Sequence, residues 1–146
     1  LWPEGENGRW PQYCRPAAVL PEPLIRRHIC VTPSPRLLQH EWAKHGTCMP
    51  TTPAGYFAAA TMLYGAVRYP DMARLSRRRI TAGAFAEAFA RANRGMDMAM
   101  LRVRVTPRGW LEEVLICLRT DFKLTRCPAG QEGAPPDARL RIWPGG

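Results

Sequence analysis

The residues best suited to chemistry lie in one short segment, His40-Glu41-Trp42-Ala43-Lys44-His45. It holds two of the three histidines of the 146-residue chain, together with one carboxylate and one ammonium group. Histidine titrates near neutral pH and can donate or accept a proton, and lysine can balance the charge that develops on a phosphoryl group. The segment therefore indicates acid–base chemistry on a phosphate ester.

A helix would bring these four ionisable groups to one side. Each helical residue advances by about 100°, so His40, Glu41, Lys44 and His45 would share an arc of about 140°. Trp42 and Ala43 would point the other way. The alternative is a solvated helix face with incidental ion pairs, which explains a single histidine well but not the whole set.

Zinc binding is a second interpretation of the same residues. The zinc-protease pattern is His-Glu-x-x-His, but position 44 is lysine and the second histidine comes one residue later. An i, i+5 spacing spreads the two imidazoles around a helix, and nothing in the spacing requires His28 or Cys30 to complete a site. We expect no metal and no other cofactor, and a zinc hydrolase remains the less favoured alternative.

Three helices that could position the segment are predicted from their caps. Each starts where a hydroxyl side chain can cap a helix or where proline needs no N–H partner, and each ends near glycine or proline. Their expected ranges are about 32–45, 52–68 and 81–95, and weaker helical turns are expected at about 21–30 and 70–76. Five side chains of the middle helix are expected on one face: Tyr56, Phe57, Ala60, Leu63 and Tyr64.

The pattern changes near Met98, where apolar residues begin to alternate with arginine as they do in a half-buried strand. Strands are predicted at about 98–105 and 110–118 around a Pro-Arg-Gly turn, with weaker candidates at 122–126 and 140–143. Helices followed by antiparallel strands favour an α+β fold. We expect a single domain over residues 1–146, with a central antiparallel sheet packed against several helices.

The charge of the chain favours a polyanionic partner. Lysine and arginine total 21 against 12 acidic residues, which gives a net charge of +9. All of these cations except Lys44 and Lys123 are arginines, which bind phosphate through paired N–H groups and stack on bases. A solvated basic surface has the same composition, so charge favours nucleic acid without deciding it. No apolar run is long enough for a membrane span, so no membrane partner is expected.

The cysteines indicate a disulfide framework, because they are numerous for a domain of this size and none forms a CxxC pair. They are Cys14, Cys30, Cys48, Cys117 and Cys127. Disulfides form in oxidising compartments, so we expect a secreted or periplasmic protein. The odd number leaves one thiol free or paired outside the chain. The start at Leu1-Trp2-Pro3, without an initiator Met or a signal peptide, predicts that the chain begins within a longer protein.

Several segments resemble the ribonuclease T2 family. His-Glu-Trp-Ala-Lys-His-Gly-Thr-Cys at 40–48 is similar to the second active-site segment of that family over nine residues. Leu1-Trp2-Pro3 resembles the end of its first segment, His-Gly-Leu-Trp-Pro. Residues 110–114, with Cys117 and Cys127, resemble its C-terminal sheet. The resemblance spans the chain and implies a bacterial-type member, truncated at its N-terminus, that lacks the N-terminal strand and the first catalytic histidine.

The resemblance implies a role for each residue of the segment. His45 would be one of two acid–base histidines, and His40 would bind the scissile phosphate. Glu41 and Lys44 would stabilise the transition state. Three residues near the N-terminus would bind substrate: Trp2 by stacking on a base, Glu4 by reading that base, and Trp10 at a position where some members have a stacking tyrosine. For both tryptophans, packing of the loop on the sheet is the alternative.

The resemblance also implies two disulfides. Cys117–Cys127 would join the C-terminal strands, and Cys14–Cys48 would tie the N-terminal loop to the end of the active-site helix. Cys30 is a rival to Cys14 as the partner of Cys48.

The predicted function is metal-independent endonucleolytic cleavage of single-stranded RNA, by transphosphorylation through 2′,3′-cyclic phosphates, with low base specificity. The reaction needs a base for the ribose 2′-hydroxyl, an acid for the leaving oxygen and cations near the phosphorane. We expect the protein to act as a monomer. The alternative is an RNA-binding domain with impaired catalysis, which the missing upstream histidine favours.

Overall fold

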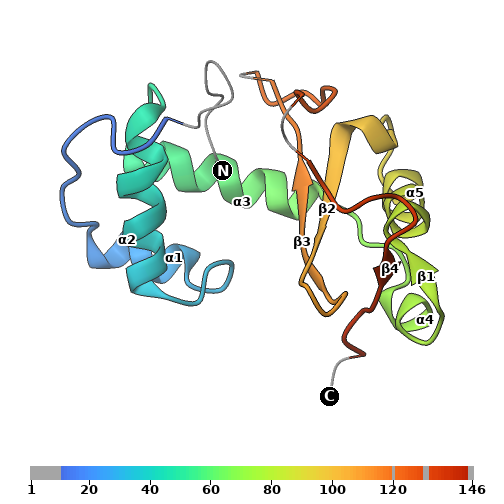
Figure 1. The fold of residues 1–146 in the computed structure, drawn as a ribbon. Coiled ribbons are helices and arrows are strands. Elements are labelled where there is room, and N and C mark those ends of the chain that lie inside the picture. The colour runs from blue at the N-terminus through green and yellow to red at the C-terminus, as the bar shows by residue number, and fades with distance from the viewer. Residues whose placement is uncertain (1–10, 120, 130–131, 145–146) are drawn as a thin grey trace. The chain divides into compact units, whose positions relative to one another are not determined.

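The computed structural model describes residues 11–119, 121–129 and 132–144 (Figure 1). The chain divides into two compact units, Leu1–Val67 (unit 1) and Arg68–Gly146 (unit 2). Helices make up unit 1, and unit 2 combines helices with antiparallel strands. The α+β fold class is therefore confirmed, and the union of both units into one domain stays a prediction.

Unit 1 is built from short helices, two of which begin at proline. They are α1 (Glu22–His28), α2 (Pro35–Lys44), the 3-10 turn η2 (Gly46–Cys48) and α3 (Pro53–Ala66). The Ser34 hydroxyl caps α2 by accepting the Leu37 N–H at 3.2 Å, and the Thr52 hydroxyl caps α3 in the same way. Helix α2 thus starts after Ser34 instead of Thr32, because Ser34 is the hydroxyl that reaches the free N–H groups of the first turn.

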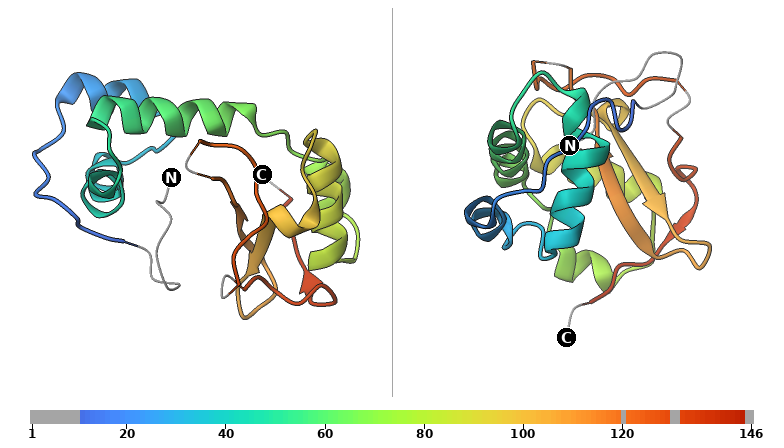
Figure 2. Two further views of the ribbon diagram at one scale, coloured as in Figure 1. Left: turned by 90° about the horizontal axis from the view of Figure 1, so that it is seen from above. Right: turned by 90° about the vertical axis from the view of Figure 1, so that its left-hand side faces the viewer.

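The core of unit 1 lies between its helices. In the left view of Figure 2, which looks along α2, α1 lies beside the start of α3. Its buried side chains form one cluster: Leu20, Leu38, Trp42, Tyr56 and Phe57. The predicted face of α3 is buried only in its N-terminal part, and Tyr64 near the other end of the helix is 54% exposed. This core covers only the N-terminal turns of α3, so Tyr56 and Phe57 are its fully buried residues.

Unit 2 carries the strands. Its elements are α4 (Met72–Ser76), β1 (Ile80–Thr81), α5 (Ala82–Ala92), the 3-10 turn η3 (Met98–Met100), β2 (Leu101–Val105), β3 (Leu111–Ile116) and β4 (Arg139–Leu140). Strands β2 and β3 form an antiparallel hairpin, and β1 pairs with β4. Thr81 caps α5, whose Phe85 and Phe89 are buried as predicted, and α5 contacts β2.

Two of the weaker strand predictions need correction. Residues 122–126 form no strand, and only an isolated bridge joins Leu118 to Leu124. Phe122 has a φ of +63°, which turns the chain back and breaks the extended run. The last predicted strand is reduced to β4, after which Arg141 makes a parallel bridge to Trp110. The antiparallel sheet therefore exists as two short pairs linked by that bridge.

Candidate active site

Helix α2 positions the predicted catalytic segment. Trp42 is buried and its ring lies 5.9 Å from that of Tyr56, so packing fixes the rotation of the helix about its axis. His40 on this helix is exposed, whereas Glu41 and Lys44 are half-buried. The expectation that Trp42 points away from the solvated side agrees with this arrangement.

His45 lies where the regular helix stops. Helix α2 ends at Lys44, and His45 is its C-cap residue with φ −114° and ψ −44°. Its side chain is only 3% exposed. The four groups therefore do not share one solvated arc: the His45 N–H still donates to the Glu41 carbonyl at 3.0 Å, but its imidazole lies on the buried side of α2 with Leu38 and Trp42.

Burial and neighbouring charges set the proton affinity of His45. Burial lowers its pKa, since the charged ring loses hydration, and the cationic Lys44 and nearby His40 lower it further. The Glu41 carboxylate opposes them by stabilising the protonated ring. Burial and the same carboxylate raise the pKa of the Tyr56 hydroxyl. Electrostatically, Glu41, His45 and Tyr56 thus belong to one site.

The segment that follows residue 12 is fastened to the end of α2. The Tyr13 N–H donates to the Lys44 carbonyl at 2.9 Å, which satisfies a free acceptor of the last helical turn. The Arg15 guanidinium donates to the carbonyls of Thr47 at 2.7 Å and Met49 at 2.6 Å. A cation at a helix C-terminus also offsets the negative end of the helix dipole.

A disulfide reinforces this attachment. Cys14 and Cys48 are bonded with their Cα atoms 4.9 Å apart, and Cys117 and Cys127 form a second disulfide in unit 2. Both predicted pairings are confirmed. Cys30 is an exposed free thiol, so it is not the partner of Cys48.

Tyr13 was not predicted as a site residue. Its ring is 59% exposed, and its centroid lies 6.5 Å from that of His40 in an edge-on arrangement. Its φ of +53° is a left-handed conformation that is costly for an aromatic residue. Its position directly before Cys14 was the signal in the sequence, because a disulfide to Cys48 brings its neighbour to the end of α2.

A shallow groove runs beside His40 along α2. It has a volume of about 460 Å³. Its lining combines apolar side chains with polar groups: Val19, Ile25, Arg36, Gln39, His40 and Ala43. The Gln39 amide holds one wall in place, since it accepts the Leu20 N–H at 2.8 Å and donates to the Ala18 carbonyl. The groove can take a flat, partly apolar group next to an imidazole and a guanidinium.

The predicted substrate-binding residues Trp2, Glu4 and Trp10 lie outside the described residues. Within the described residues, no three His, Cys, Asp or Glu side chains are grouped so that they could hold a metal ion. Nor does this part of the chain contain a helix long and apolar enough to cross a membrane.

Comparison with known proteins finds a curated relative that is named as a ribonuclease. No family model matches the chain. A probable ribonuclease of Haemophilus influenzae is 35% identical over 82 residues, which cover 53% of the chain and 30% of that relative. The chain thus spans less than a third of the length of this relative.

Solved structures give the fold over almost the whole chain. RNase NT in complex with 5′-AMP matches with a TM-score of 0.69 and 24% identity, covering 97% of the chain and 79% of RNase NT. An RNase-related protein from Calystegia sepium matches with a TM-score of 0.73 and 22% identity, covering 96% of the chain and 78% of that protein. Trichomaglin, an S-like ribonuclease, matches with a TM-score of 0.72 and 17% identity, covering 96% of the chain and 77% of trichomaglin. The chain therefore has the fold that RNase NT, the RNase-related protein of Calystegia sepium and trichomaglin share.

Proposed function

We propose that the protein is an endoribonuclease that cleaves single-stranded RNA at the segment His40–His45 without a metal ion. The observation that carries the proposal is the buried His45 at the end of α2, with the charges of Glu41 and Lys44 acting on it. Likeness to a probable ribonuclease in sequence and to ribonucleases in fold supports it.

In this proposal His45 is the base for the ribose 2′-hydroxyl. A pKa below its usual value keeps the imidazole neutral near neutral pH, so that it can accept a proton. When the ring becomes charged, the Glu41 carboxylate stabilises it. Attack of the 2′-oxygen on phosphorus then breaks the bond to the 5′-oxygen, which takes up a proton from water as it leaves, and forms a 2′,3′-cyclic phosphate.

Lys44 and His40 would hold the phosphate. Lys44 is the last residue of α2 and directly precedes His45. Its ammonium group can offset the charge that builds up on the phosphorane. His40 is exposed beside the groove and can donate a hydrogen bond to a phosphate oxygen. These positions suit a chain of nucleotides that crosses the end of α2.

Stacking would hold the bases. Single-stranded RNA exposes the faces of its bases, and aromatic side chains bind such faces with little discrimination between sequences. The exposed Tyr13 ring beside His40 is one candidate, and Trp2 and Trp10 are two others, with Glu4 reading the edge of a base. Low base specificity follows from this kind of contact. The disulfides support a secreted or periplasmic location for such an enzyme.

The test is a digest of single-stranded RNA by the whole chain in the presence of EDTA. We expect short products that end in 2′,3′-cyclic phosphate, which mass spectrometry identifies. His45→Ala should slow cleavage at least about a hundredfold, because it removes a proton-transfer group. RNA that stays bound but uncut would support the RNA-binding domain, and loss of cleavage in EDTA would support a zinc hydrolase.

The two lysines of the chain provide a matched control. Lys44→Ala should lower kcat, whereas Lys123→Ala removes the same charge from unit 2, where Lys123 lies 3.4 Å from Asp121 on the surface. Exposed pairs of this kind contribute little to stability. Equal losses of activity in both variants would contradict a catalytic role for Lys44.

A further inference from the structure

The C-terminal segment of unit 2 presents a row of alternating side chains. Leu140 and Ile142 are buried, with 2% and 7% of their surface exposed. The residues that alternate with them, Arg139, Arg141 and Trp143, are exposed. Because side chains alternate along extended chain, the core holds the two aliphatic residues and the other three face solvent.

A cluster of one guanidinium group and two indole rings forms on this exposed side. The Arg141 guanidinium carbon lies 5.6 Å from the centre of the Trp110 ring. The Trp110 and Trp143 rings lie 5.7 Å apart at 55°. Trp143 is nevertheless 74% exposed, so most of its surface remains open to a ligand.

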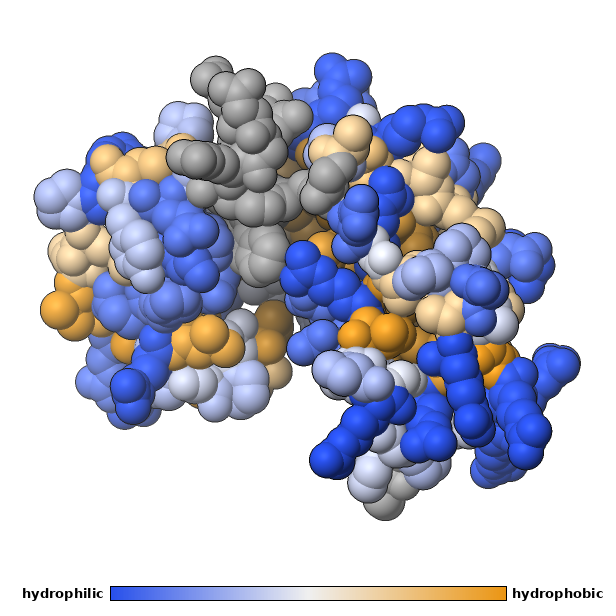
Figure 3. Space-filling view, in the orientation of Figure 1, coloured by the Kyte–Doolittle hydropathy of each residue, from blue (hydrophilic) through white to orange (hydrophobic). Residues whose placement is uncertain are grey.

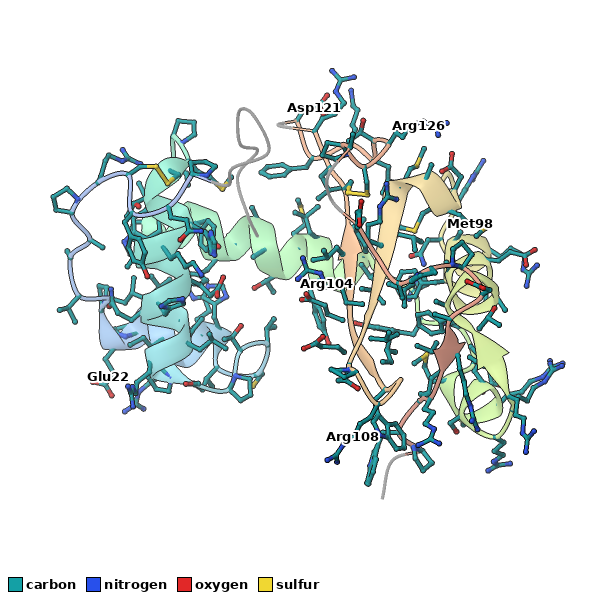
Figure 4. The ribbon with its side chains drawn as sticks, viewed as in Figure 1. Glu22, Met98, Arg104, Arg108, Asp121 and Arg126 are labelled. Atoms are coloured by element: carbon teal, nitrogen blue, oxygen red, sulfur yellow. A yellow bond between two sulfur atoms is a disulfide. The ribbon has the colours of Figure 1, made fainter. Side chains whose placement is uncertain are left out.

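The hairpin turn adds a further arginine to the same place. The Arg141 N–H donates to the Gly109 carbonyl at 2.7 Å, which brings the turn and this segment together. Arg108 in that turn is exposed and points outward at the tip of the hairpin (Figure 4). We call Arg108, Trp110, Arg139, Arg141 and Trp143 the Arg–Trp face.

Further arginines lie next to strand β1, which pairs with β4. Thr81 lies opposite Arg139 in this pair. Three exposed arginines directly precede the strand: Arg77, Arg78 and Arg79. Strongly hydrophilic residues accordingly gather in the lower right of Figure 3, over α4 and β4.

No described carboxylate neutralises these arginines. The five ion pairs of the described residues involve other cations, at Arg26, Arg91, Arg104, Arg119 and Lys123. Like charges on one face repel one another, and a polyanion that replaces their counterions reduces the repulsion. The face is therefore suited to a negatively charged polymer.

We propose that the Arg–Trp face is a second binding site for single-stranded RNA, in which the arginines contact phosphates and Trp143 stacks on a base. Arginine forks onto phosphate oxygens, and an exposed indole offers the flat surface that an unpaired base requires. The site goes beyond the proposed cleavage at His40–His45, since it lies in unit 2 and needs only to bind. Its binding can be measured whether or not the chain cleaves RNA.

An anionic membrane is the main rival occupant. Membrane-binding faces bury several apolar side chains below a basic rim. Here the aliphatic residues Leu140 and Ile142 point into the core, and Trp143 is the one large apolar residue of the face that is mostly exposed. These features favour RNA over lipid.

The test uses the whole chain and a fluorescent 2′-O-methyl oligouridylate, which cannot be cleaved through its 2′-oxygen. The double variant Arg139→Gln/Arg141→Gln should bind roughly tenfold more weakly at low salt. It should also flatten the plot of log affinity against log salt by about 1.4, at about 0.7 for each lost phosphate contact. Trp143→Ala should weaken binding at least about fivefold with an unchanged salt slope, since stacking releases no counterions.

The control removes the same charge elsewhere in unit 2. Arg94→Gln/Arg126→Gln replaces two exposed arginines, and Figure 4 shows Arg126 at the opposite end of the hairpin from Arg108. A loss of affinity as large as that of the first double variant would overturn the proposal in favour of net charge. So would an unchanged affinity in both Trp143→Ala and the first double variant. Selective loss of binding to phosphatidylserine vesicles, with oligonucleotide binding intact, would assign the face to membranes instead.

Discussion

Unit 1 and unit 2 use charge in opposite ways. Unit 1 contains all three histidines, and two of them, His28 and His45, are buried. Unit 2 contains most of the arginines, which are largely exposed, around a core of aromatic and aliphatic side chains. Burial changes proton affinity, whereas exposure leaves a charge free to attract a distant polyanion. The contrast agrees with the two proposals, in which proton transfer belongs to unit 1 and attraction of RNA to unit 2.

The two units also differ in how far apart in the sequence their cross-linked residues are. In unit 1 a loop crosses back to the end of α2 through a disulfide, a backbone hydrogen bond and the Arg15 guanidinium. In unit 2 the hairpin and the Cys117–Cys127 disulfide join residues that are close in sequence. The candidate site in unit 1 therefore depends on contacts between segments that are more than 30 residues apart in the sequence.

Removal of each disulfide gives the largest expected difference between the units. The bonded cysteines are 34 residues apart in unit 1 and 10 apart in unit 2. Loop-closure entropy predicts a loss of roughly 4 kcal/mol for Cys14→Ser/Cys48→Ser and roughly 3 kcal/mol for Cys117→Ser/Cys127→Ser. Hydrogen exchange measured by mass spectrometry resolves the units, and each variant should increase exchange mainly in its own unit. A greater loss in the second variant would contradict the loop-length argument.

Two glycines of unit 1 give a smaller and sharper contrast. A Cβ atom on Gly46 would overlap the buried Trp42 ring, with Cζ3 only 2.8 Å away, whereas one on Gly65 would meet nothing within 4 Å. Gly46→Ala should destabilise unit 1 by about 1–3 kcal/mol, because Trp42 must move away from Tyr56. Gly65→Ala, within α3, should stabilise by up to about 1 kcal/mol. Thermal unfolding compares them, and a neutral Gly46→Ala would show that Trp42 adapts without cost.

The local elements could be predicted from sequence because their signals are local. Hydroxyl caps before Pro53 and Ala82 defined the starts of α3 and α5, and alternation around Val103 defined β2. The error at Thr32 arose because two hydroxyl residues compete within three positions, and only hydrogen-bond geometry decides between them. Phe122 carried no sequence signal for its positive φ, so the strand predicted there was wrong.

The sequence predicted which residues of α2 form the candidate site, but it did not predict how deeply His45 is buried. Helical periodicity placed His40, Glu41 and Lys44 correctly relative to the buried Trp42. It grouped His45 with these ionisable residues, whereas the His45 imidazole is buried, as are Leu38 and Trp42 on the same side of the helix. Tyr13 was missed as a site residue because its approach to His40 depends on a connection across the chain.

Acidification should affect unit 1 more than unit 2. Burial lowers the pKa of His28, with a further decrease from Arg27, and burial lowers that of His45. In the unfolded chain these histidines become protonated as the pH falls below their unperturbed pKa of about 6.5. In the folded chain they become protonated only at lower pH, so protonation favours the unfolded state. Stability should be full above that unperturbed pKa and should fall as the pH decreases through and below it.

Denaturant unfolding at a series of pH values checks this prediction. His28→Gln removes one of the two titrating groups while keeping a polar partner for the Thr61 hydroxyl, which lies 2.9 Å from His28 Nδ1. The variant should lose less stability on acidification than the wild type. Unit 2 contains no histidine, so its hydrogen exchange, corrected for intrinsic rates, should not follow the histidine titration. An identical pH profile in variant and wild type would rule out His28 as a source of the effect.

The smallest expected change in stability comes from Tyr13, and it separates ligand binding from folding. Tyr13→Gly relieves the left-handed conformation at φ +53° but adds flexibility to the unfolded chain, so the two effects should cancel to within about 1 kcal/mol. It also removes the exposed ring beside His40, so under the proposed function KM for RNA should rise about fivefold or more while kcat changes little. Tyr13→Phe keeps the ring and should match the wild type. A Tyr13→Gly enzyme with normal KM would instead mean that the tyrosine ring, held at the end of α2, contributes nothing to binding RNA.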